Sequence, residues 1–194
     1  MNNAIYQTIV RRRSVRLFKQ QEVSQAIIRK VINAARLAPS AANLQFLEYL
    51  AVTNKEIREK IFPHTKWAGY LWPVRVPGLN KRPTFYIVIL INKQKTKRAD
   101  LRDVGASAEN ILLSLASFGL GACWIGSLEK KPIRKILNIP SGYEIDSLIA
   151  GGYPAESPKL EQDAENIKYW LDKKGHLHVP KRPLKNILHF NSLK

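Results

Sequence analysis

The sequence of 194 residues contains a single cysteine, Cys123, and its apolar runs are short. One cysteine cannot form an intramolecular disulfide, so we expect the chain to work in a reducing compartment, the cytoplasm. The longest apolar run extends from Phe85 to Ile91, far below the roughly 20 residues of a membrane-spanning helix. Polar residues interrupt the first ten positions, and arginines follow this stretch instead of preceding it, which argues against a secretory signal. We therefore expect a globular protein without a membrane segment.

Acidic residues are also scarce: 15 Asp and Glu stand against 32 Lys and Arg, which gives a formal net charge of +17. Such a charge favours an anionic partner, and nucleic acid is the first class to consider. The densest basic cluster, residues 92–98, contains no aromatic side chain and no nucleic-acid-binding motif. A lysine-rich surface that serves solubility, or a smaller anion such as a nucleotide phosphate, would account for the same charge. The charge alone does not identify the partner.

The order of hydrophobic patterns predicts one α+β domain over residues 1–194. Ser24 is the expected N-cap of a helix with one apolar face, and the β-branched run 84–91 predicts a strand buried on both faces. Gly119 and Gly121 are expected to end a long helix that begins at Asp103. Further helices are expected at 3–11, 55–62 and 133–137, further strands at 47–52, 122–128 and 143–151, and a hairpin at 167–179.

Two segments are expected to form functional surfaces. The small residues Gly105 to Ala108 line the first turns of the long helix and would let another helix approach closely, as at a subunit interface. The loop 63–83 contains four prolines and the aromatic residues Trp67, Tyr70 and Trp72, which is typical of a lid or a contact surface. The sequence leaves open whether these aromatic side chains cap a ligand pocket or contact a second subunit.

The familiar catalytic and metal-binding patterns are missing from the sequence. His176 and His178 alternate along an expected strand, but no third ligand accompanies them. Cys123 lies inside an apolar run, where a buried and unreactive thiol is expected instead of a nucleophile. The sequence has no GxSxG, Walker or GxGxxG motif. We therefore expect no metal ion and no catalytic side chain.

Three arginines and a serine gather where the first expected helix ends. Arg12, Arg13, Ser14 and Arg16, here named the arginine cluster, carry guanidinium groups and a hydroxyl that can converge on one phosphate. A solvated helix terminus would show the same residues, because the helix dipole favours cations at that end. From the residues alone, both interpretations stay open.

The motifs along the chain resemble, in order, those of the nitroreductase-like FMN-dependent flavoproteins. Arg12–Phe18 is similar to their RRSxRxF opening, and Ala38–Gln45 is similar to their APSxxNxQ signature. Six such motifs occur in the right order and cover nearly the whole chain. The remaining four are Asp103–Asn110, which matches the central helix of the family, and then Gly119–Gly126, Gly151–Pro154 and the basic Val179–Leu184.

This resemblance implies a mixed central β-sheet flanked by helices, and an intertwined homodimer with two FMN sites at the subunit interface. It implies that the arginine cluster holds the FMN phosphate and ribityl chain together with Arg182 and Lys181. Trp124, Ile125 and Gly126 would lie along the isoalloxazine, with a backbone N–H near N5. The residues that would approach the flavin from the partner subunit are Pro39, Ser40, Ala41 and Asn43.

The resemblance also implies the reaction. NADH or NADPH stacks on the flavin, passes hydride to N5 and leaves, and a small-molecule acceptor such as a nitroaromatic compound or a quinone takes its place in a ping-pong cycle. The protein supplies binding, orientation and exclusion of water, in agreement with the missing catalytic side chains. Two alternatives are another FMN-dependent dehydrogenase or reductive dehalogenase of the same fold, and a basic nucleic-acid-binding protein.

Overall fold

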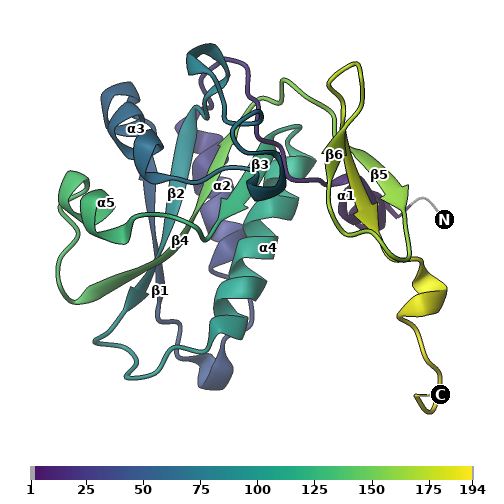
Figure 1. Cartoon of the computed structure of the whole chain (residues 1–194). Coiled ribbons are helices and arrows are strands. Elements are labelled where there is room, and N and C mark those ends of the chain that lie inside the picture. The colour runs from purple at the N-terminus through teal and green to yellow at the C-terminus, as the bar shows by residue number, and fades with distance from the viewer. Residues whose placement is uncertain (1–2, 194) are drawn as a thin grey trace.

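The computed structural model describes residues 3–193, which form a four-stranded sheet with helices on both faces and a smaller three-stranded sheet beside it (Figure 1). All three pairings of the larger sheet are antiparallel. The mixed character that the resemblance implies is limited here to one parallel bridge, which joins Ser14 to Ala122 at the β3 edge. The strands of the larger sheet, in spatial order, are β1 (Leu47–Val52), β2 (Phe85–Asn92), β4 (Tyr143–Gly152) and β3 (Gly121–Ile125).

Each face of this sheet is covered by a pair of helices. The helices α2 (Gln25–Ala35) and α4 (Leu101–Ser117) pack their apolar stripes against one face, and α3 (Lys55–Ile61) and α5 (Lys130–Ile136) cover the other. Every residue of β2 is buried, as its continuous β-branched run predicts for a strand with a core on both sides. The sheet therefore separates two apolar layers.

Side-chain caps fix where the helices begin. Ser24 Oγ accepts a hydrogen bond from the Ile27 N–H at the start of α2, as expected. The helix α4 begins at Leu101, two residues before the expected start, because Asp100 caps it by accepting from the Arg102 N–H. It ends where Gly119 adopts a φ of +71°, which favours glycine. The helix α5 also begins three residues early, in a lysine-rich turn that apolar periodicity does not reveal.

The C-terminal part of the chain forms the second sheet, in the order β5 (Lys159–Gln162), β7 (Leu177–Lys181) and β6 (Trp170–Leu171). The expected hairpin is confirmed: β6 and β7 are antiparallel and joined by a turn in which Gly175 has a φ of +77°. The parallel strand β5 was not predicted, because its four residues carry no buried apolar alternation. Beyond β7 the chain extends away from the body (Figure 1).

The segment 63–83 is irregular, as expected, and contains short 3-10 turns at Phe62–His64, Gly69–Leu71 and Leu79–Lys81. The expectation that Trp67 caps a pocket or contacts a second subunit is wrong. Its side chain is 3% exposed and stacks on Phe62, so it belongs to the core. Tyr70 and Trp72, in contrast, are 53% and 70% exposed and keep an aromatic surface on this loop.

The stripe of small residues on α4 divides between the core and the surface. Ser107 and Ala108 are buried within their own chain, so they do not face a second helix from another subunit. Gly105 and Ala106 are only half-buried, and a Cβ at Gly105 would meet no atom within 4 Å, so the surface at Gly105 is open to close approach. Among residues 3–193, no helix is long and apolar enough to cross a membrane.

Candidate functional site

The arginine cluster is held against the edge strand β3. The Val15 N–H donates to the Ala122 carbonyl at 2.9 Å, next to the parallel bridge between Ser14 and Ala122. This approach requires glycine at position 121, because a Cβ there would lie 2.7 Å from Val15 Cγ1. The bridge places the arginine cluster beside the strand that carries Trp124 and Ile125.

Two guanidinium groups of the cluster keep a buried N–H without an acceptor, although Arg13 Nη1 donates to the Arg12 carbonyl. The Nε atoms of Arg13 and Arg16 are buried, yet neither finds a hydrogen-bond partner among the described residues. Burial and the neighbouring charge of Arg12 lower the pKa of the Arg13 guanidinium from its ordinary value. Arg12 itself forms a half-exposed ion pair with Glu109, with Nε and Oε1 3.3 Å apart. Since buried donors are normally paired, this arrangement suits an anionic group that accepts from Arg13 and Arg16.

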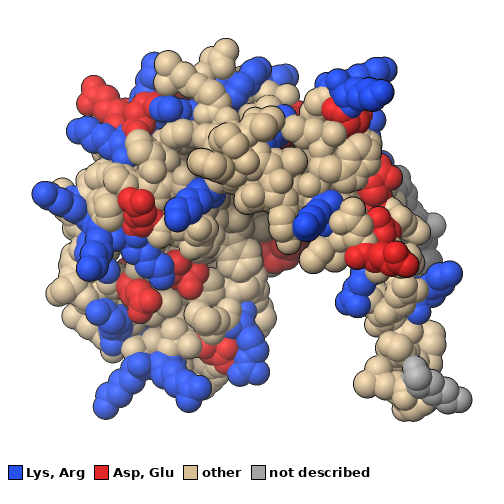
Figure 2. Space-filling model, viewed as in Figure 1, with Lys and Arg blue, Asp and Glu red and all other residues tan. Residues whose placement is uncertain are grey.

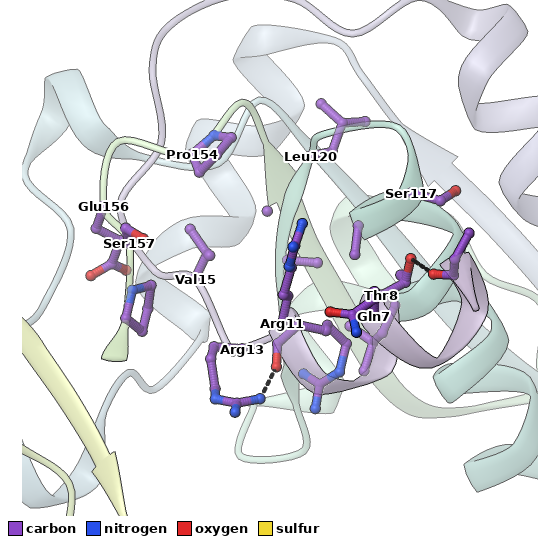
Figure 3. A pocket seen from close by; sticks show the side chains of 17 residues that line it. Gln7, Thr8, Arg11, Arg13, Val15, Ser117, Leu120, Pro154, Glu156 and Ser157 are labelled. Atoms are coloured by element: carbon purple, nitrogen blue, oxygen red, sulfur yellow. Dashed lines mark hydrogen bonds between the residues drawn. The ribbon is translucent and has the colours of Figure 1, made fainter. Parts of the chain in front are cut away.

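A cavity of about 510 Å³ opens beside the cluster, within the size range of small-molecule sites. Figure 3 shows Gln7 and Thr8 on one side of it, Glu156 and Ser157 on the other, and Arg13 between these two sides. The apolar part of its wall comes from the end of α4 and the start of β3, mainly Leu112, Ala116, Leu120 and Ala122.

The end of β3 exposes the Trp124 side chain and, just after the strand, the backbone at Gly126. Trp124 is 42% exposed, and its Nε1–H donates to Ser147 Oγ at 2.7 Å, which fixes the indole. Ile125 is buried in the core, and Gly126 is exposed, with open space where a side chain would be. The strand ends at Ile125, three residues before the expected end, because the chain then turns to pair Leu128 with Thr65 of the irregular segment.

Cys123 lies on the opposite face of β3 from Trp124. Its side chain is 5% exposed, and burial raises the pKa of the thiol. The expectation of a buried thiol is confirmed. Each of the two histidines that alternate near β7 contacts a carboxylate: His178 Nδ1 lies 2.6 Å from Glu161, and His176 Nδ1 lies 2.9 Å from Asp172. Within residues 3–193, no group of three or more potential ligands could hold a metal ion.

The second group of expected flavin contacts lies elsewhere in the same chain. Pro39 to Asn43 form a loop that leads into β1, and Ser40 and Ala41 bind the carboxylate of Asp103 at the start of α4. β1 and β3 are opposite edges of the sheet, separated by two strands and thus by about 14 Å at the usual strand spacing. One chain therefore does not bring this loop together with the arginine cluster and Trp124.

Lys181 and Arg182, at the end of β7, are exposed. No side-chain hydrogen bond or ion pair within the described part of the chain joins either of them to the arginine cluster. The residue just before β6 contacts the cluster instead: the centroid of the Tyr169 ring lies 4.9 Å from the Arg16 Cζ. Sequence reasoning missed this contact because Tyr169 belongs to no motif.

Two acidic residues near the expected flavin contacts were also missed as site residues. Glu156 accepts from the backbone at Arg16 and Leu17, and Asp103 holds the loop at Ser40. Both were visible in the sequence as rare acidic residues within or just after a recognised motif. Their place within or just after a motif was the signal that could have identified them.

The remaining positive charge does not gather into a single band on the face shown in Figure 2. Lys and Arg side chains lie there in separate groups, with Asp and Glu between them. This distribution suits a solvated surface on that face better than a continuous track for a nucleic-acid backbone.

Comparison with known proteins gives a consistent result. A protein of Methanothermobacter thermautotrophicus whose name combines NADH dehydrogenase and NAD(P)H nitroreductase is 32% identical, with 86% of this chain and 87% of that protein aligned. The FMN reductase [NAD(P)H] of Bacillus subtilis is 28% identical, with 84% and 73% aligned. Among solved structures, an FMN-dependent nitroreductase from Clostridium difficile matches with a TM-score of 0.67 and 28% identity, covering 96% of this chain and 98% of that one.

The sequence profile of the Nitroreductase family matches residues 9–69 and 71–153, which include the arginine cluster, the loop at Ser40 and the whole four-stranded sheet. The chain belongs to the Nitroreductase family.

Proposed function

We propose that this protein is an FMN-dependent NAD(P)H oxidoreductase that acts as a homodimer, each chain forming one domain over residues 1–194. The observation that carries the proposal is the pair of buried guanidinium Nε atoms, on Arg13 and Arg16, that have no acceptor among the described residues. A phosphate is the kind of group that accepts from such donors. The names of the relatives, an NAD(P)H nitroreductase and an FMN reductase, support the same cofactor and reductant.

The residues present fit FMN in charge and in donor geometry. In the proposed site Arg12, Arg13, Ser14 and Arg16 hold the phosphate and ribityl chain, and the exposed Lys181 and Arg182 add charge. Trp124, Ile125 and Gly126 provide a wall and backbone donors for the ring, and the Ser147 hydrogen bond keeps the Trp124 indole in place. Bound FMN supplies the hydride chemistry, which this chain's side chains lack. The protein binds and orients the flavin and shields it from water.

A second chain completes the proposed site. The loop that carries Pro39, Ser40, Ala41 and Asn43 lies at the far edge of the sheet from the arginine cluster, so a partner subunit would have to supply it. Exposed apolar side chains support such a partner. They include Ile5 and Tyr6 on α1 (Ala4–Arg11), and Leu184, Ile187 and Phe190 on the extended tail.

The proposed electron acceptor is a small planar molecule such as a nitroaromatic compound or a quinone. The exposed aromatic side chains of Tyr70 and Trp72 support this choice, because the loop that carries them is tied to the end of β3 by the Thr65–Leu128 bridge. The buried lone thiol of Cys123 is consistent with work in a reducing cytoplasm.

The test is a visible absorption spectrum of the purified protein before and after addition of FMN and dialysis. We expect a retained flavin spectrum at about one FMN per chain, and rapid bleaching by NADH or NADPH under anaerobic conditions. Arg13→Ala/Arg16→Ala should lose bound FMN, whereas Arg29→Ala, which removes an exposed arginine from α2, should retain it. Equal retention by the double variant and the parent would contradict the proposal.

A further inference from the structure

The carboxylate of Glu156 lies at the centre of a buried network beside the arginine cluster. Its Oε1 accepts hydrogen bonds from the backbone N–H groups of Arg16, at 2.5 Å, and Leu17, at 3.0 Å. Its Oε2 forms an ion pair with Arg75. The side chains of Glu156 and Arg75 are only 7% and 11% exposed, so water solvates neither charge well. Three donors from two distant segments therefore satisfy one buried carboxylate.

The same network holds Arg16 from both ends. Glu156 fixes its backbone, and the ring of Tyr169 lies 4.9 Å from its Cζ, a distance typical of a cation–π contact. Tyr169 in turn contacts Tyr70, with ring centroids 5.0 Å apart. Although the Arg16 side chain is held in this way, its buried Nε has no acceptor among the described residues. Arg16 is thus oriented and still free to donate.

Arg75 and Tyr70 both come from the irregular loop 63–83. This loop reaches the backbone of Arg16 through Glu156, and it reaches the side chain of Arg16 through Tyr169. The aromatic loop is therefore connected to the arginine cluster at two independent points.

The buried negative charge of Glu156 needs a cationic partner, and Arg75 is that partner. Glu156 and Arg13 line the same cavity (Figure 3). A buried carboxylate without a partner attracts the nearest cation strongly, because the surroundings screen charge poorly. Without Arg75, Glu156 would pair with Arg13 or Arg16 and occupy the place of an external anion. The ion pair with Arg75 neutralises the carboxylate and leaves the buried Nε atoms of Arg13 and Arg16 available.

We infer that Glu156 and Arg75 are positioning residues for phosphate recognition: Glu156 orients Arg16 through its backbone, and Arg75 keeps the Glu156 carboxylate from competing with the phosphate. This inference rests on the proposed FMN function. It assigns a role to the loop 63–83, which holds the cluster in its phosphate-accepting state through Arg75. Neither residue needs to touch the cofactor.

The test compares FMN with riboflavin, which has the same ring and ribityl chain but no phosphate. The ratio of their dissociation constants, measured by flavin fluorescence quenching on the full chain freed of bound flavin, isolates phosphate recognition. Arg75→Met should lower the preference for FMN by about tenfold or more, because the freed carboxylate pairs with the cluster. Adding Glu156→Gln should restore the preference to within about threefold of the parent, because the amide oxygen still accepts from the backbone and carries no charge.

A matched control is Arg82→Met, which removes an arginine from the end of the same loop. Arg82 pairs with Glu59 and lies over Phe62, with no contact to Glu156, so the ratio should not change. Arg75→Gln serves the same purpose as Arg75→Met if the latter does not fold, as judged by its circular dichroism spectrum. An unchanged ratio in the Arg75 variant, or a double variant no better than the single one, would overturn the inference.

These outcomes are separable from a failure of the proposed function. If the parent protein binds neither flavin, or does not prefer FMN to riboflavin, the FMN proposal itself fails. If the parent prefers FMN and the Arg75 variant keeps that preference, only the positioning role of Arg75 and Glu156 fails.

Discussion

The hydroxyl of Ser40 donates a 2.7 Å hydrogen bond to Oδ2 of Asp103, and the same carboxylate accepts from the backbone N–H of Ala41. Ser40 Oγ in turn accepts from the Gln45 N–H at 3.1 Å. These bonds fix a loop in which Ala42 and Asn43 have φ values of +49° and +54°, a region that side chains disfavour. The start of α4 therefore determines the shape of the loop that the proposed dimer presents to the flavin.

Replacing Asp103 with Asn should weaken FMN binding. An amide oxygen at the position of Oδ2 still accepts from Ser40 and Ala41, but the amide NH2 then replaces Oδ1, which lies 3.1 Å from the Ala41 nitrogen. Two donors would face each other there, and we expect a cost of about 1–3 kcal/mol in the free energy of unfolding. Asp100→Asn is the matched control, because Asn caps a helix as well as Asp does and this residue does not touch the loop. Flavin fluorescence titration and thermal unfolding of the two variants measure both effects.

A mixed dimer tests whether the loop acts on the partner's site. If one chain carries Asp103→Asn and the other Arg16→Ala, one site of the proposed dimer receives both changes and the other receives neither. The mixed dimer should then regain one full-affinity FMN site per two chains. Two weakened sites would instead mean that the loop and the arginine cluster serve the same site from the same chain.

Much of the fold was predictable because its signals are local. The buried strand at Phe85, the Ser24 cap and the turn at Gly175 each follow from a few neighbouring residues. Trp67 was misassigned because a sequence does not tell whether an aromatic side chain in a loop folds back onto the core. The strand β5 was missed because it is stabilised by backbone pairing with β7 and not by its own apolar pattern.

The candidate site was predictable only in part, for a related reason. The arginine cluster carries its chemistry in adjacent residues, so its pattern is legible in the sequence. Glu156 and Arg75 act on Arg16 from 140 and 59 positions away along the chain. Pairings over such separations depend on the register of the sheet and on loop packing, which no local pattern encodes.

Gly121→Ala should disrupt the contact between the arginine cluster and β3. The new Cβ would lie 2.7 Å from Cγ1 and 2.8 Å from Cβ of Val15, so the segment must move away from the strand. We expect a loss of about 1–3 kcal/mol in unfolding free energy, as for other overpacked sites, and weaker FMN binding. Gly142→Ala is a suitable control, because its Cβ would meet only one atom, at 3.9 Å. Similar unfolding curves and FMN affinities for the two variants would contradict the close approach.

The stability of the second sheet should depend on pH through Asp172. Hydrogen bonds from the side chain and then the backbone of His176 hold the pKa of this carboxyl well below its ordinary value. A lowered pKa in the folded state means that the ionised form stabilises the fold above about pH 4, and that this contribution is lost as the pH falls toward the folded-state value. The melting temperature of Asp172→Asn should therefore lie below that of the parent at neutral pH and approach it in acid.

The control for this titration is Asp146→Asn, since the Asp146 side chain makes no hydrogen bond within residues 3–193. The difference in melting temperature between Asp146→Asn and the parent should not shrink as the pH falls. A constant difference between Asp172→Asn and the parent from neutral to acid pH would show that the Asp172 carboxylate does not contribute through its charge.

Gly105→Ala tests whether α4 packs against a second subunit. Within one chain a Cβ at this position meets no atom within 4 Å, and alanine favours a helix over glycine, so the isolated fold should gain about 0.5–1 kcal/mol. In a dimer with close helix packing at Gly105, the same Cβ would intrude on the partner and raise the dimer dissociation constant by about tenfold or more. Ser114→Ala, on the same helix but away from the small residues, should leave dimerisation unchanged. Sedimentation equilibrium of the three proteins measures this, and a Gly105→Ala dimer as tight as the parent would place the subunit contact elsewhere than at Gly105.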